Sequence, residues 1–136
     1  MPTIYRFEEI EAWQTARQLT NQIYQLSDQG KFARDYGLRD QMRRAAVSIM
    51  SNIAEGFESR TQNMFVEYLG RARGSAGEVR AQLYIAMDQN YLTPVEFKEV
   101  FSLAETCSRQ IYRFIDYLSR QPNAHRIGET DASYEV

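Results

Sequence analysis

The sequence predicts an all-α protein, an antiparallel four-helix bundle with up-down-up-down connections. Apolar residues recur at spacings of three and four along four long stretches, which is the period of one helix face. The 136 residues include only 3 prolines and 7 glycines, so few positions would interrupt long helices. The short connections between these stretches favour antiparallel neighbours.

The first two helices are expected over residues 7–29 and 37–58. The core face of the first is Ala12, Ala16, Leu19, Ile23 and Leu26. The core face of the second is Leu38, Met42, Ala45, Ile49 and Ile53. Gly30 is expected to end the first helix, and Gly56 is a candidate closing signal for the second.

The last two helices are expected over residues 61–90 and 93–120. Thr61 is suited to cap the third helix. The fourth begins with the clearest start signal in the chain, because Thr93, Pro94 and Glu96 fit a capping box with proline at the first helical position.

The chain divides into a bundle over residues 1–120 and a flexible acidic tail over residues 121–136. The helical period stops at Pro122, and the charged residues of the tail are Arg126, Glu129, Asp131 and Glu135. The hydrophobic share of 43% is ordinary for a soluble domain, and no apolar run is long enough to span a membrane. With no secretory signal, the expected location is the cytoplasm.

The sequence predicts no enzyme and no metal or cofactor. The one histidine, His125, lies in the tail, and Cys107 lies on the core stripe of the fourth helix, where it acts as a small hydrophobe. Neither the Glu-x-x-His pairs of bundle metal sites nor a phosphate-binding glycine loop is present.

Arginine supplies nearly all of the positive charge. The net charge of -2 argues against a strongly basic nucleic-acid binder. Two interpretations of the arginines on the second and third helices remain open, a solvated face with ion pairs or a surface that contacts phosphates. The candidate nucleic-acid-binding residues are Arg43, Arg44, Arg71, Arg73 and Arg80.

Short polar side chains share one side of the second helix, in the stretch "RRAAVSIMSNIAEGF". They are Ser48, Ser51, Asn52 and Glu55. The third helix has a similar zone formed by Gly74, Ser75, Gly77 and Glu78. We interpret the two zones as a helix-contact motif in which close backbones and hydrogen bonds compensate for the glycines. Gly74→Leu is therefore expected to overpack the contact.

The same stretch resembles the signature RRAAVSIPSNIAEG of bacterial four-helix-bundle proteins first noticed as products of intervening sequences in 23S ribosomal RNA genes. "FEEIEAWQTAR" and "FVEYLGRARGSAGEVRAQL" also fit that family, so the resemblance covers residues 7–118. Met50 replaces the proline of the signature, which favours a straighter helix.

The resemblance implies a homopentamer, and it includes a branch that serves diversity-generating retroelements by binding reverse transcriptase and nucleic acid. The expected function is a non-enzymatic oligomeric adaptor that engages RNA, DNA or a reverse transcriptase. The alternative is an oligomeric scaffold with protein partners only. Apolar residues outside the core stripes also predict a homo-oligomer. They are Trp13, Tyr24, Met50, Phe57, Phe101 and Ile115.

Overall fold

The computed structural model describes residues 3–121, and every regular element in that part of the chain is helical. A 3-10 turn, η1 (Phe7–Glu9), precedes five α-helices. These are α1 (Glu11–Leu26), α2 (Gly30–Arg34), α3 (Tyr36–Glu58), α4 (Gln62–Asp88) and α5 (Pro94–Arg120). The all-α prediction is confirmed. The predicted acidic tail, apart from Gln121, lies outside the described residues.

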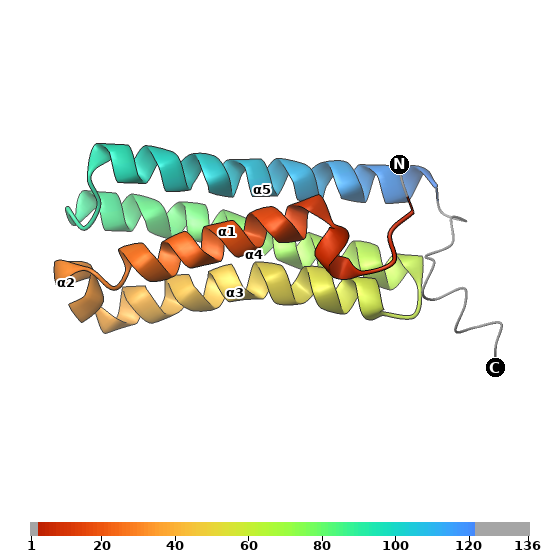
Figure 1. Ribbon diagram of the computed structural model, residues 1–136, viewed down its shortest axis with the longest axis horizontal. Helices are drawn as coiled ribbons and strands as arrows, with labels where there is room; N and C mark the ends of the chain where they lie inside the picture. The colour runs from red at the N-terminus through yellow and green to blue at the C-terminus, as the bar shows by residue number, and fades with distance from the viewer. Residues whose placement is uncertain (1–2, 122–136) are drawn as a thin grey trace.

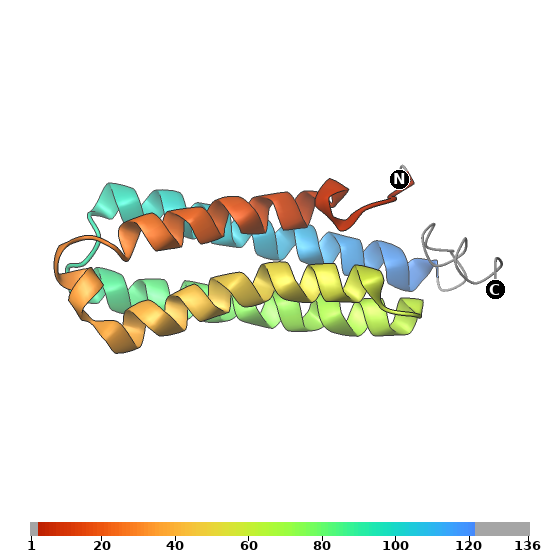
Figure 2. The same ribbon diagram turned by 60° about the horizontal axis from the view of Figure 1, so that its bottom comes forward.

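The four long helices lie side by side along the long axis of the molecule (Figures 1 and 2). Helix α1 packs against α3 and α5, and α4 packs against the same two helices. The colours of Figure 1 show that the chain reverses direction between successive long helices. Within the described part of the chain, no helix combines the length and apolar character needed to cross a membrane.

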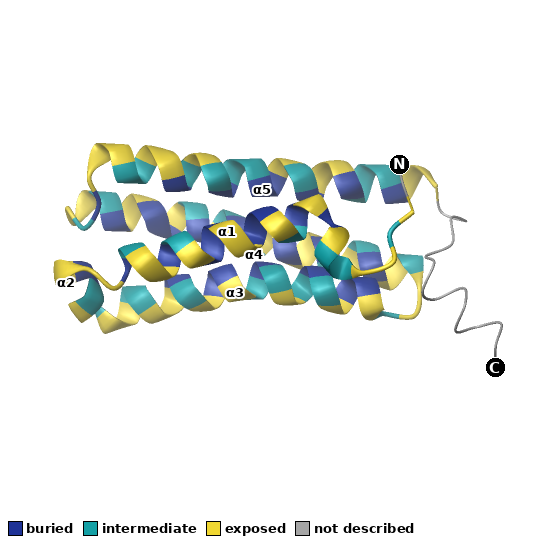
Figure 3. Ribbon diagram, viewed as in Figure 1, coloured by how far each residue is buried: buried dark blue, intermediate teal, exposed yellow. Residues whose placement is uncertain are grey.

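The predicted core faces are buried between the long helices. Figure 3 shows this most clearly on α5, where exposed residues follow the outer edge and buried ones face the neighbouring helices. An aromatic cluster closes one end of the core, because the ring of Phe65 contacts Phe57 and Phe114 edge-on at centroid distances of 6.0 and 5.4 Å. Edge-to-face geometry of this kind adds to the stabilisation from apolar burial.

Polar side chains fix where three of the long helices begin. The hydroxyl of Thr93 accepts from the backbone N–H of Glu96, whose carboxylate accepts from the N–H of Thr93, so the predicted capping box is confirmed. Thr61 caps α4 through the N–H of Met64, as expected. Asp35 caps α3, a role that the sequence analysis did not assign. Each cap satisfies a donor that the helix itself leaves unpaired.

The boundaries of the first predicted helix are wrong at both ends. Residues 7–9 form a 3-10 turn, and the extended backbone of Ile10 separates this turn from α1. Helix α1 ends at Leu26, and Gly30, with a φ of +51°, begins α2 instead of ending α1. Helix α2 was not predicted because five residues are too few to show a period. It buries Phe32, which stacks on Tyr91 at 5.2 Å.

Most of the second apolar stripe belongs to the core of this chain. Phe57 is buried, and the side chains of Trp13, Met50, Phe101 and Ile115 are partly buried against the core. Only Tyr24 of the set is exposed. The stripe is therefore largely used in packing within the chain, and the homo-oligomer stays a prediction.

Candidate functional site

The polar stripe of α3 makes one direct hydrogen-bonded contact with α4. The hydroxyls of Ser48 and Ser75 lie 3.0 Å apart across the two helices. The amide of Asn52 donates to the carbonyl and the hydroxyl oxygens of Ser48, at 2.8 and 3.0 Å. These three residues form a half-buried polar contact between α3 and α4.

The other members of the predicted helix-contact motif do not pack inside the chain. Ser51, Glu55, Gly74 and Glu78 are exposed, and Gly77 is half-buried. A Cβ atom at Gly74 or Gly77 would meet nothing within 4 Å. The expectation that Gly74→Leu overpacks a contact between helices of one chain is therefore wrong, because no neighbouring side chain occupies that space.

The close approach between α3 and α4 occurs at Gly56 instead. A Cβ atom there would lie 2.7 Å from Cβ of Tyr68 and 2.9 Å from Cδ1 of Phe65. Neither distance is compatible with an ordinary side chain, so this contact requires glycine. From the sequence, Gly56 was predicted only as a helix-closing signal.

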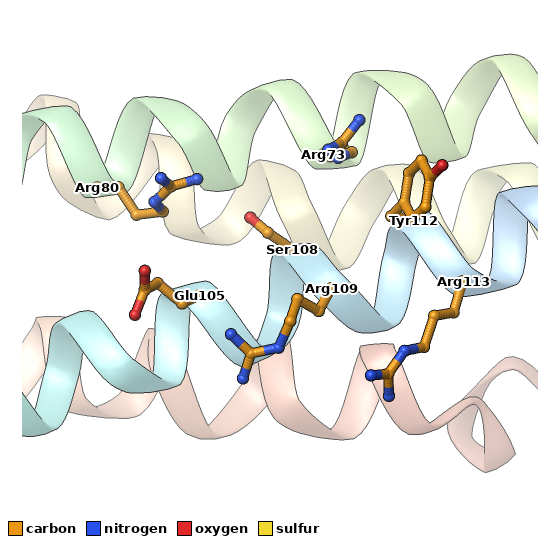
Figure 4. A pocket seen from close by; sticks show the side chains of 7 residues that line it. All are labelled: Arg73, Arg80, Glu105, Ser108, Arg109, Tyr112 and Arg113. Carbon is orange, nitrogen blue, oxygen red and sulfur yellow. The ribbon is translucent and has the colours of Figure 1, made fainter.

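A cavity of about 380 Å³ lies between α4 and α5 and is lined mainly by arginines (Figure 4). Its lining residues are Arg73, Arg80, Glu105, Ser108, Arg109, Tyr112 and Arg113. The lining thus includes four guanidinium groups and one carboxylate, and in the described part of the chain none of the four is in an ion pair. The excess of positive charge favours the binding of an anion at this site.

Two polar atoms of the cavity are buried without a hydrogen-bond partner. The Ser108 side chain points toward α4 (Figure 4), and its Oγ has no partner among the described residues although only 8% of the residue is exposed. Nε of Arg80 is also buried and unpaired. Since buried polar groups are nearly always hydrogen-bonded, two unpaired donors beside one cavity indicate a place for an external acceptor.

Only two of the five predicted arginines line this cavity, Arg73 and Arg80. Arg71, two residues from Arg73, lies on another side of α4 and pairs with Glu67 at 3.2 Å. Residues two apart on a helix do not share a face, so Arg71 and Arg73 present their charges on different sides of α4.

The two predicted arginines of α3 lie elsewhere. Arg43 donates to the hydroxyl of Ser27 at 2.8 Å and stacks over Tyr24, so it ties α3 to the end of α1. Arg44 is exposed on α3, outside the cavity. Neither residue extends the positive surface between α4 and α5.

A family model for the 23S rRNA-intervening sequence protein matches residues 8–113 of this chain. The chain belongs to that family. The match includes every residue that lines the arginine cavity. The signature stretch of α3 lies outside the cavity. It contributes Ser48, which contacts Ser75, and Gly56, where α3 comes close to α4.

The fold is similar to that of a solved structure described as a protein with unknown function from the S23 ribosomal protein family of Bacteroides thetaiotaomicron VPI-5482. The TM-score is 0.72, the identity is 16%, and the match covers 77% of this chain and 95% of the other. A search of curated proteins gave no match. The family and this relative indicate no enzyme class.

The contribution of α5 to the site was not predicted. Arg109 and Arg113 are four residues apart, which places them on one face of a helix. That spacing was a usable signal, but the register that sets Arg73 against Tyr112 could not be read from it. The distance from Cζ of Arg73 to the centre of the Tyr112 ring is 4.8 Å.

The remaining reactive side chain of the described residues is Cys107, which is fully buried on α5. Burial raises the pKa of its thiol to about 12. The thiol thus stays protonated at neutral pH and packs as a small apolar group, as predicted. Residues 3–121 contain no group of three or more His, Cys, Asp or Glu side chains placed to hold a metal ion.

Proposed function

We propose that this protein is a non-enzymatic oligomeric adaptor that engages nucleic acid, or an enzyme acting on it such as a reverse transcriptase, through its arginines. The observation that supports this function is the cavity between α4 and α5, whose lining includes four arginines and one glutamate. Guanidinium groups bind phosphates through paired hydrogen bonds, and these four have no carboxylate partner in the described chain.

A single copy of this site would bind weakly, because the chain as a whole carries a net charge of -2. In our proposal the four long helices form an antiparallel up-down-up-down bundle, and several bundles assemble into a ring, a homopentamer by the family resemblance. Repeating the arginine site around a ring raises the strength of binding to a long polyanion through multivalency.

A second candidate function is a scaffold that binds only proteins. It is favoured by the exposed surface of small side chains beside the Ser48–Ser75 contact, which includes Val47, Ser51 and Gly74. Small residues allow another helix to approach closely. In native mass spectrometry, Gly74→Leu should shift the protein toward monomer without unfolding it if this surface joins copies, and should leave the assembly unchanged if it does not.

Fluorescence anisotropy with labelled RNA and DNA tests the nucleic-acid part of the proposal. Arg73→Gln and Arg109→Gln should each weaken binding, whereas Arg120→Gln should not, because Arg120 lies outside the cavity and pairs with Asp116. Arg44→Gln tests whether the exposed surface of α3 also contacts the nucleic acid. If the wild type does not bind at about 50 mM salt, the adaptor loses its nucleic-acid role and the protein scaffold becomes the better account.

A further inference from the structure

Two exposed tyrosines lie along the same helices as the arginine cavity: Tyr112 lines it, and Tyr84 is four residues beyond Arg80 on α4. Tyr112 is 52% exposed and has Arg73 over one face of its ring. Tyr84 is 54% exposed, and its ring lies 5.4 Å from that of Phe97 and 5.2 Å from that of Phe101. Both rings are thus accessible and are supported by neighbours that limit their movement.

The tyrosines and the arginines follow one another along the contact between α4 and α5, and we call this row of side chains the α4–α5 groove. On α4, Arg73, Arg80 and Tyr84 are seven and four residues apart and therefore share a side. On α5, Phe101 packs against Tyr84, and Tyr112 packs against Arg73, so the two stripes run in opposite directions. From residue 73 to residue 84 the helix rises about 16 Å, the length of about five stacked nucleotides.

We propose that this groove binds single-stranded nucleic acid, an inference that rests on the proposed function and names its substrate. One phosphate accepts hydrogen bonds from Arg80 and Ser108 in the cavity. Bases on either side stack on Tyr84 and Tyr112. Arg73, Arg109 and Arg113 supply further positive charge along the strand.

The physical case for a single strand has two parts. A duplex keeps its base faces stacked inside, so it offers nothing to the tyrosine rings, whereas a single strand exposes them. The flexible backbone of a single strand can bend to bring one phosphate close to Ser108, which is more than nine-tenths buried between two packed helices. Basic grooves with interspersed aromatic side chains are the common solution for binding single strands.

The negative charge of Glu105 allows the proposal to predict a substitution that strengthens binding. Figure 4 shows its carboxylate on the same side of the cavity as the end of Arg80. A phosphate bound there would be repelled by this negative charge. Glu105→Gln should therefore strengthen binding of a single strand.

The experiment measures the anisotropy of a labelled oligonucleotide of about twelve nucleotides, as a single strand and as a duplex, with the full-length protein. Tyr84→Leu and Tyr112→Leu should each weaken single-strand binding by roughly 5- to 150-fold, with little effect on the duplex. Tyr36→Leu is the matched control, because Tyr36 is also exposed, at 62%, and has Arg39 over its ring at 4.8 Å, but it lies on α3.

Ser108→Ala distinguishes ligand binding from a structural role. Removing an unpaired buried hydroxyl should leave the melting temperature unchanged or raise it, while single-strand binding weakens. Equal binding of both probes, with no loss in the tyrosine variants, would overturn the groove assignment and leave the nucleic-acid adaptor standing. If neither the single strand nor the duplex binds, both proposals are overturned.

Discussion

Gly56 of α3 lies directly against Tyr68 of α4, so that a methyl group at residue 56 would come within 2.7 Å of the tyrosine Cβ. Because a Cβ atom is fixed to the backbone, Tyr68 cannot rotate away from this contact. The two helices must separate or the substituted helix must shift.

Gly56→Ala should therefore destabilise the fold by about 1–3 kcal/mol through overpacking, less up to about 1 kcal/mol from the better helix propensity of alanine. Gly70→Ala is the matched control, since a Cβ there meets nothing within 4 Å and should stabilise the helix. Urea denaturation followed by circular dichroism measures both. Equal stabilisation by the two substitutions would show that α3 and α4 are not close at Gly56.

The Ser48–Ser75 hydrogen bond should couple the two helices energetically. In a double-mutant cycle of Ser48→Ala and Ser75→Ala, the coupling should be about 0.5–1.5 kcal/mol. Ser48→Ala should cost more than Ser75→Ala, because Asn52 also donates to the Ser48 hydroxyl. A coupling near zero from denaturation curves would mean that the two hydroxyls do not interact.

Tyr91 should make stability fall at high pH. Its hydroxyl donates to Asp35 at 2.9 Å, and this hydrogen bond, helped by desolvation and by the negative charge of Asp35, raises the pKa of Tyr91 above its usual value. Because the pKa is higher in the folded state, the stabilisation is complete below about pH 10 and is lost as the pH rises through the folded pKa.

The comparison of wild type with Tyr91→Phe isolates this group, since all other titrations are shared. Between about pH 8 and pH 11 the free energy of unfolding should fall further for the wild type than for the variant. Parallel curves in urea titrations at the two pH values would refute the coupling between Tyr91 and Asp35.

Cys107 should be unreactive while the protein is folded. Its burial and its pKa of about 12 leave almost no thiolate at about pH 8, which is the form that attacks disulfide reagents. An aromatic disulfide reagent should label no thiol in the native protein and one in guanidinium, as the chain has a single cysteine. Rapid labelling without denaturant would place this part of α5 outside the core.

Periodicity predicted the long helices because each has a continuous apolar face, and α5 shows this best from Phe97 to Leu118. The same method could not find α2, which is held by the burial of Phe32 against Tyr91 and not by its own period. Local propensity also failed at Ile10, where an extended residue separates η1 from α1.

The site was less accessible to sequence reasoning, because it depends on the register between α4 and α5. Arg73 and Arg80 could be grouped from their spacing alone. Arg109 and Arg113 join them only because two helices are adjacent in the fold. Gly74 was predicted to pack against another helix because glycine in a helix interior lowers stability. That loss of stability does not indicate which glycine lies against a neighbouring side chain. The structure gives that role to Gly56.

The salt dependence of single-strand binding tests the central claim, that the arginines of the α4–α5 cavity contact phosphates. With about four phosphate contacts, the logarithm of the binding constant should fall with the logarithm of salt concentration with a slope of about -3. The double variant Arg73→Gln, Arg109→Gln should reduce that slope by about 1.4. A slope unchanged in the double variant would contradict the claim.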